Sequence, residues 1–194
     1  MESSFYRPVM CCLTGRTCIC PSIRFFVMLK KIETFINRVV DVVGGCLSIL
    51  LLLMVLNVAY DVMMRYIFRA SSVGMQEMEW HIFSVVILFG VGVALKNEGH
   101  VRVDFVYDRL HKRKQAMINI LGTIFLLMPL ALLILFGSFE FVQDAYSSGE
   151  ISEDPGGLPF RWIIKGMIPL SFAFLLFAAF GYILQNVEKY RSSK

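Results

Sequence analysis

The residues best suited to chemistry are four cysteines near the start of the chain, Cys11, Cys12, Cys18 and Cys20. Clustered thiolates hold zinc in many small sites, but such sites use paired Cys-x2-Cys knuckles or add histidines. The spacing here, Cys-Cys-x5-Cys-x-Cys, contains no such pair, and no histidine lies nearby. The sequence therefore predicts no metal site in this segment.

The three histidines raise the question of haem binding or proton relay. His81 lies one helical turn after Glu77 and next to Trp80, as expected of an amphipathic ring at a membrane surface. His100 and His111 lie outside the apolar runs, so no two histidines face each other to hold a haem. We expect no cofactor.

Two further arrangements look catalytic at first sight. His100 and Asp104 are four residues apart, but no nucleophile or metal ligand accompanies them, which favours a hydrogen bond that anchors a loop. Asp41 and Asp61 lie at the ends of apolar runs, whereas a proton-coupled exporter needs a carboxylate within the membrane. Asp61 and Arg65 share one helix face, which predicts an interfacial ion pair or, as an alternative, a partner-binding face. The sequence predicts no enzyme.

These residues are positioned by long apolar runs. The chain has 194 residues, of which 57% are hydrophobic and 18% charged. A spanning helix needs about 20 apolar residues. The sequence predicts an all-α integral membrane protein with four transmembrane helices, over residues 39–61, 77–96, 115–139 and 162–187. A soluble bundle is excluded because the runs have no charged face, and a β-barrel because alternating segments are absent. Pro129 predicts a kink in the third helix.

The charges between the runs indicate orientation. Basic residues dominate the N-terminal segment, the loop after the second run and the C-terminal tail, whereas acidic residues dominate the loop after the third run. Because basic loops stay in the cytoplasm, both termini are expected there. The basic residues then set topology and meet phospholipid headgroups, and no nucleic acid partner is expected.

The flanking segments complete the expected organisation. Residues 29–38 have helical apolar spacing and predict a short interfacial helix or the cytoplasmic end of the first span. The apolar stripe from Val103 to Leu110 predicts a second interfacial helix between the second and third spans. Residues 1–28 match nothing that follows and are expected to be a separate extension, untranslated if Met28 is the true start. Residues 29–190 form the membrane domain, and residues 191–194 a tail. Gly44 with Ser48, and Gly90 with Ala94, predict close helix packing.

Taken in order, several motifs resemble those of the small permease (DctQ-type) subunit of tripartite ATP-independent periplasmic (TRAP) transporters. The resemblance covers about residues 29–190 and lacks only an aromatic residue before the second span. The first motif is Arg-Tyr-x-Phe, at Arg65, Tyr66 and Phe68, and it is followed by a pair of carboxylates, Glu77 and Glu79. Next come a pair of small residues, Gly90 and Ala94, and a Gly-His-x-x-x-Asp stretch at Gly99, His100 and Asp104. The last is a Gly-Leu-Pro stretch followed by Trp and Pro, at Gly157, Leu158, Pro159, Trp162 and Pro169.

The resemblance implies a non-catalytic subunit of the bacterial or archaeal inner membrane. Its partners would be a large membrane subunit, which carries the sodium and organic-acid sites, and a periplasmic substrate-binding protein. Docking of the latter is expected on the outer surface, at Arg65, Arg69, Glu77, Glu150, Glu153 and Asp154. The alternatives are an autonomous four-helix exporter and the membrane anchor of a redox complex. The transported acid stays open, because its specificity would lie in the other chains.

Overall fold

The computed structural model describes residues 21–70, 72–97, 110–152 and 154–192, with side chains from Met28 onward. All regular structure in these ranges is helical. Four helical stretches are long and apolar enough to cross a membrane: Met28–Ile67, Val73–Lys96, Lys112–Ser147 and Arg161–Arg191. The predicted all-α class and the number of spanning helices are thus confirmed.

Helix α1 is the longest element and runs unbroken from Pro21 to Ile67. The prediction of a separate interfacial helix over residues 29–38 is therefore wrong. No proline or glycine interrupts residues 22–43, so the helix continues through the basic segment into the apolar run. At about 1.5 Å per residue its 47 residues extend roughly 70 Å, well beyond a hydrocarbon core of about 30 Å. The second predicted interfacial helix lies mostly in residues 98–109, outside the described residues.

The third spanning stretch changes helix type in its middle. Helix α4 covers Lys112–Gly122, a π-helical turn covers Thr123–Leu127, and α5 covers Met128–Ser147. The N–H of Met128 donates to the carbonyl of Thr123, five residues back. Pro129, which follows at once, has no N–H to continue the α-helical ladder. The sequence predicted a kink at this proline, and the structure has a π-helical turn directly before it.

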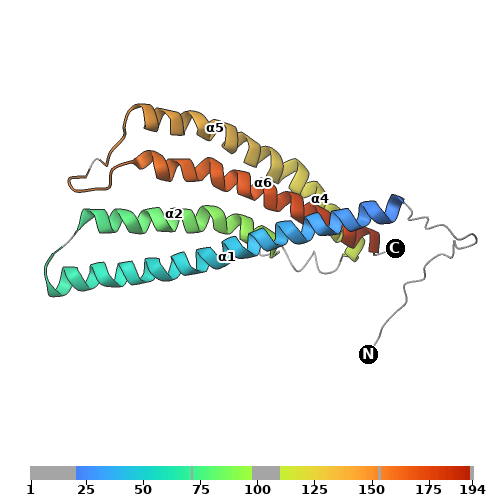
Figure 1. Ribbon diagram of the computed structural model, residues 1–194, viewed down its shortest axis with the longest axis horizontal. Helices are drawn as coiled ribbons and strands as arrows, with labels where there is room; N and C mark the ends of the chain where they lie inside the picture. The colour runs from blue at the N-terminus through green and yellow to red at the C-terminus, as the bar shows by residue number, and fades with distance from the viewer. Residues whose placement is uncertain (1–20, 71, 98–109, 153, 193–194) are drawn as a thin grey trace, which may run out of the picture.

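The helices lie side by side in the order α1, α2, α6, α5 (Figure 1), with α2 spanning Val73–Lys96 and α6 spanning Arg161–Ser192. Helix α6 is central because it packs on both α2 and α5, and also meets α1 and α4. In its most apolar stretch 33% of residues are buried, against 11% in each of the other three spans. The chain thus forms a layer of helices in which α6 makes the most contacts with its neighbours.

Small residues permit the closest helix contacts. A Cβ at Gly92 would lie 2.8 Å from the ring of Phe174, and one at Gly181 would lie 2.6 Å from Ile36. Gly44 meets Val93 in the same way, at 3.2 Å, as its spacing predicted. At Gly90, in contrast, none of the described residues lies within 4 Å of the added Cβ, and the close contact of α2 with α6 is made two residues further on, at Gly92.

Two flanks of the layer remain apolar and uncovered. Along α1, the exposed side chains include Ile49, Leu52, Leu53 and Leu56, and α5 exposes Leu133 and Phe136. Buried apolar residues are few and centre on α6, where Leu175, Ala179 and Tyr182 pack against Leu95 and Ala131. Such surfaces require a bilayer or another membrane protein around them.

Candidate functional site

The loop end of the layer is defined here as the end where α1 stops, α2 starts, α5 stops and α6 starts; it lies on the left in Figure 1. Its central contact is made by Glu77, in the second turn of α2. One carboxylate oxygen accepts from the hydroxyl of Ser152, and the other accepts from the backbone N–H of Leu158. Glu77 thereby fastens the α5–α6 loop to α2, across 81 residues of sequence.

Gly157 makes room for this contact. A Cβ added there would collide with Ser152 and would lie 2.8 Å from the Glu77 carboxylate. Gly156, just before it, has φ of 88°, a conformation in which glycine is favoured. The loop end therefore brings together two motifs that the sequence singled out separately, the carboxylate at Glu77 and the Gly-Leu-Pro stretch at residues 157–159.

The end of α1 is ordered by an ion pair of its own. Arg65 donates to Asp61 across 2.6 Å, as the four-residue spacing predicted, and the Asp61 side chain is buried. One turn earlier, Asn57 donates to the carbonyl of Met75 and links α1 to α2. Beyond them Tyr66 and Arg69 are exposed. The backbone of Arg69 has φ of 50°, a strained value for a side chain of this kind.

Glu79, two residues after Glu77, takes no part in the contact with Ser152 and Leu158. Its side chain is half-buried, and one carboxylate oxygen, Oε1, is buried without a hydrogen-bond partner among the described residues. The two carboxylates of the motif thus differ in environment, since Glu77 accepts two hydrogen bonds and Glu79 leaves one oxygen unsatisfied. Unpaired buried carboxylates are costly and are rarely without a role.

A hollow of about 310 Å³ lies beside the Glu77 contact. Lys165 forms an ion pair with Glu150 inside it, and its ammonium lies 4.2 Å from the centre of the Phe141 ring. His81 turns Nδ1 to the carbonyl of Glu77, at 2.6 Å, which leaves Nε2 as its other polar atom. The lining residues are Trp80, His81, Ser84, Glu150, Arg161, Ile164 and Lys165.

Helix α6 begins at Arg161, beyond the motif residues Leu158 and Pro159. Phe160, which precedes it, has φ of 67° and is exposed. Trp162 packs edge-to-face against Tyr146 of α5, with ring centres 5.5 Å apart. Further along, Pro169 lies within α6 and is buried.

The opposite end, where α6 finishes, is held by charged contacts between helices. Lys96 forms an ion pair with Asp41 and donates to the carbonyl of Asn37, at 3.2 Å. Lys30 reaches Glu188 across 2.9 Å. Arg113 donates to the hydroxyl of Tyr190, at 3.0 Å. The basic side chains at this end therefore join α1 to α2 and α6, and α4 to α6.

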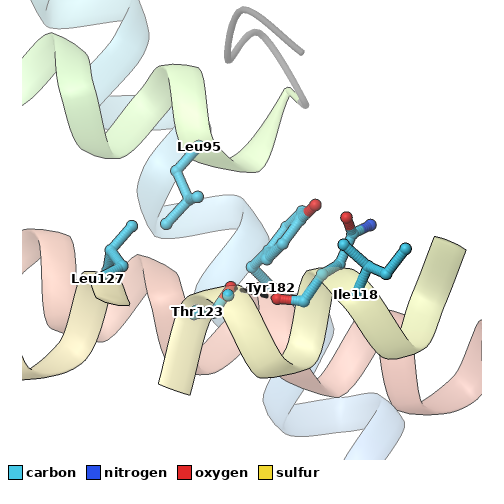
Figure 2. Close-up of a pocket in the computed structure, with 7 residues that line it drawn as sticks. Leu95, Ile118, Thr123, Leu127 and Tyr182 are labelled. Carbon is cyan, nitrogen blue, oxygen red and sulfur yellow. Dashed lines mark hydrogen bonds between the residues drawn. The ribbon is translucent and has the colours of Figure 1, made fainter. Parts of the chain in front are cut away.

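A smaller cavity of about 190 Å³ lies near this end, between α2, α4 and α6 (Figure 2). Leu95 reaches from α2 toward Tyr182 of α6, and the hydroxyl of Thr123 donates to the carbonyl of Asn119. Asn119 in turn donates to Asn186, which is fully buried and itself donates to the carbonyl of Tyr182. The side chains of Asn119, Thr123 and Asn186 are thus all hydrogen-bonded.

No Asp, Glu, Lys, Arg or His occurs within residues 42–60, 82–95, 115–139 or 166–187. In the described ranges, no three His, Cys, Asp or Glu side chains come close enough to hold a metal ion. The charged side chains of the spanning helices therefore lie toward the two ends of these helices.

Some predicted site residues cannot be placed. Gly99, His100, Asp104 and Glu153 lie outside the described residues, as do the four N-terminal cysteines. Sequence reasoning in turn missed Ser152, Gly92 and the Asn119–Asn186 pair. The asparagines gave a signal that was available, since an amide within an apolar run needs a partner.

The arrangement defines a class, a polytopic helical membrane protein without Asp, Glu, Lys, Arg or His in the middle of its spans. The family described as "Tripartite ATP-independent periplasmic transporters, DctQ component" matches residues 54–189. The chain belongs to this family. It is also 26% identical over 142 residues to a Haemophilus influenzae (strain Rd) protein provisionally described as a TRAP transporter small permease protein. That match covers 73% of this chain and 86% of the relative.

Proposed function

We propose that this chain is the static, non-catalytic small subunit of a TRAP transporter in the inner membrane, with both termini in the cytoplasm. It packs beside a large permease subunit that moves an organic acid together with sodium, and it helps to dock a periplasmic substrate-binding protein. The family membership supports the assignment as a small transporter subunit.

The observation that carries the scaffold role is the distribution of charge along the helices. A transport path needs polar or ionisable ligands at mid-depth, and transporter sites use interrupted helices to provide them. Here the middle of every span lacks charged residues, and the described polar groups near Asn119 and Asn186 satisfy one another. This distribution suits a structural scaffold, because the middle of the spans offers no charged ligand for a transported ion or substrate.

The exposed flanks support a membrane partner. Side chains on nearly all sides of α1 between residues 49 and 60 are exposed, and α5 exposes bulky residues such as Phe136. A layer of this kind buries little of its own apolar surface, so a large subunit seated on one flank leaves the other to lipid.

Reconstitution tests the scaffold role. We expect vesicles containing this chain and a large TRAP permease subunit from the same organism to take up a radiolabelled organic acid when a sodium gradient and the binding protein are supplied. Vesicles containing only this chain should take up none. Sodium-driven uptake by the chain alone would refute the proposal, and uptake by the large permease alone at the full rate would refute a required scaffold.

Docking of the binding protein is proposed at the loop end, where acidic side chains gather. Asp154 is exposed, whereas Glu150 is engaged with Lys165 and Glu77 with the α5–α6 loop. The carboxylate of Asp154 has no partner among the described residues, so with its sequence neighbour Glu153 it is the better candidate contact. Arg65, in the last turn of α1, and Arg69, just beyond that helix, lie at the same end of the layer.

Charge reversal tests the docking surface. The double change Glu153→Lys and Asp154→Lys should lower binding-protein-dependent uptake at least about tenfold, as expected when like charges replace a few kcal/mol of complementary contact. Lys114→Glu, at the opposite end, serves as the control and should leave uptake unchanged. Equal uptake by the double variant and the wild type would exclude these two residues from docking.

A further inference from the structure

Among the residues that line the hollow beside the Glu77 contact, basic side chains outnumber acidic ones. Arg161 and Lys165 line it against one carboxylate, that of Glu150, which already pairs with Lys165. The guanidinium of Arg161 has no ion-pair or hydrogen-bond partner among the described residues, and the side chain is half-buried. The Glu77 carboxylate, which lies outside the lining, attracts Arg161 electrostatically, while its two hydrogen bonds come from Ser152 and Leu158. A guanidinium whose N–H groups are not engaged among the described residues is suited to an anion with oxygen acceptors, which it can bind with two N–H groups.

The surroundings of the hollow are those of the membrane surface. It opens at the ends of α2 and α6, both of which can span a membrane, and Trp80 at its rim is 69% exposed. Tryptophan is enriched at the level of lipid headgroups. An anion in this hollow therefore lies at the depth of phospholipid phosphates.

An apolar strip runs from the hollow along α2 toward the middle of the membrane. Trp80, Ser84, Ile87 and Val91 follow each other at intervals of four, three and four residues, so they share one face of the helix. Ile87 and Val91 on this strip are exposed, at 49% and 39%. An acyl chain laid along them would start at the mouth of the hollow.

We propose that this hollow binds the phosphodiester headgroup of an anionic membrane phospholipid, with an acyl chain lying along Ile87 and Val91. Arg161 donates to the phosphate oxygens, and Lys165, which has three N–H donors, adds a second contact while it keeps Glu150. At about 310 Å³ the hollow lies at the lower limit for ligand sites, which suits a headgroup and leaves the chains outside.

Lipid retention by the purified full-length chain tests the proposal. The probe is 1-palmitoyl-2-oleoyl-phosphatidylglycerol, added in mild detergent and counted by native mass spectrometry. We expect one tightly held lipid on the wild type. Arg161→Gln, which removes the charge, and Ser84→Leu, which fills the hollow and keeps its charges, should each lower the bound fraction at least about tenfold. Arg38→Gln, an exposed arginine elsewhere on α1, is the matched control and should retain the lipid.

A second measurement reports position. In a Trp162→Phe background Trp80 is the remaining tryptophan, and a small fraction of phosphatidylglycerol with brominated chains in phosphatidylcholine nanodiscs should quench it. Arg161→Gln should reduce this quenching to that given by brominated phosphatidylcholine. Arg161→Gln removes a charge from the hollow, whereas Ser84→Leu fills its space. If one of these two variants fails to fold, the other still tests the proposal. Retention in both variants, equal loss in Arg38→Gln, or displacement of the lipid by inorganic phosphate would each overturn the proposal.

Discussion

At the scale of single residues, Glu77 does most to define the loop end. Its carboxylate accepts from the Ser152 hydroxyl and the Leu158 N–H, and so connects the start of α2 with the loop that leads into α6. The contact depends on Gly157, because any side chain there would occupy the space of Ser152 and of the carboxylate itself. A glycine is thus required here for space, whereas at Gly156 the positive φ requires one.

We predict that Gly157→Ala lowers the free energy of unfolding by about 1–3 kcal/mol, the usual cost of forcing extra atoms into a packed position. Thermal unfolding in detergent measures it. Gly166→Ala is the matched control, since nothing lies within 4 Å of a Cβ there and alanine favours the helix. Its unfolding temperature should equal or slightly exceed that of the wild type. Equal behaviour of the two variants would contradict the close contact at Gly157.

The buried amide pair supports a second prediction. Asn186→Ala removes the acceptor of the Asn119 amide at a fully buried position, and should lower the free energy of unfolding by about 1–2 kcal/mol. The double variant with Asn119→Ala should cost less than the sum of the single changes, because it leaves no orphaned group. Gln143→Ala, at an exposed position on α5, is the control and should be neutral. Strict additivity would show that the two amides do not interact.

At the scale of elements, small residues determine how closely α2 and α6 approach. Gly92 lies against Phe174, whose ring also packs on Phe89 with centres 5.7 Å apart. The Phe174 ring therefore contacts α2 at two residues, Phe89 and Gly92. Gly90, one half-turn away on the same helix, has open space. Gly92 therefore lies in a close helix contact, whereas Gly90 does not contact another helix among the described residues.

This difference gives a paired prediction. Gly92→Ala should lower the free energy of unfolding by about 1–3 kcal/mol, because the new Cβ lies 2.8 Å from the Phe174 ring. Gly90→Ala should be neutral or slightly stabilising, since it only improves helix propensity. Denaturation of both variants in the same detergent measures the two changes in the free energy of unfolding. A larger loss at position 90 than at position 92 would contradict the packing described for α2 and α6.

The sequence predicted the elements better than their arrangement. Uncharged runs locate the spans because only bilayer crossing demands them, but helices continue past the runs wherever no breaker intervenes, as α1 does before residue 39. The lateral order of helices was not predictable, since runs that are apolar all round have no preferred face. Glu77 and Leu158 were each singled out, but their contact depends on the path of the α5–α6 loop, which no periodicity encodes.

At the scale of the whole molecule, the layer has two chemically different ends. The end where α6 finishes, called here the basic end, carries Lys30, Lys31, Lys112 and Arg113. The loop end carries Glu150 and Asp154. Contacts such as Lys30–Glu188 and Lys96–Asp41 hold the helices together at the basic end. The asymmetry is therefore part of how the layer is assembled as well as a signal for its insertion.

Labelling of single cysteines tests the orientation that this asymmetry predicts. In a variant whose five native cysteines are replaced by serine, Asp154→Cys and Lys31→Cys place one thiol at each end, both at exposed positions. Retention of positive charge in the cytoplasm predicts that a membrane-impermeant maleimide labels position 154 in spheroplasts, and position 31 only after permeabilisation. The reverse pattern would move the α5–α6 loop to the cytoplasm. A periplasmic protein could then no longer reach Asp154, and the lipid in the hollow would belong to the inner leaflet. The orientation thus decides which of the surfaces described above can meet which partner.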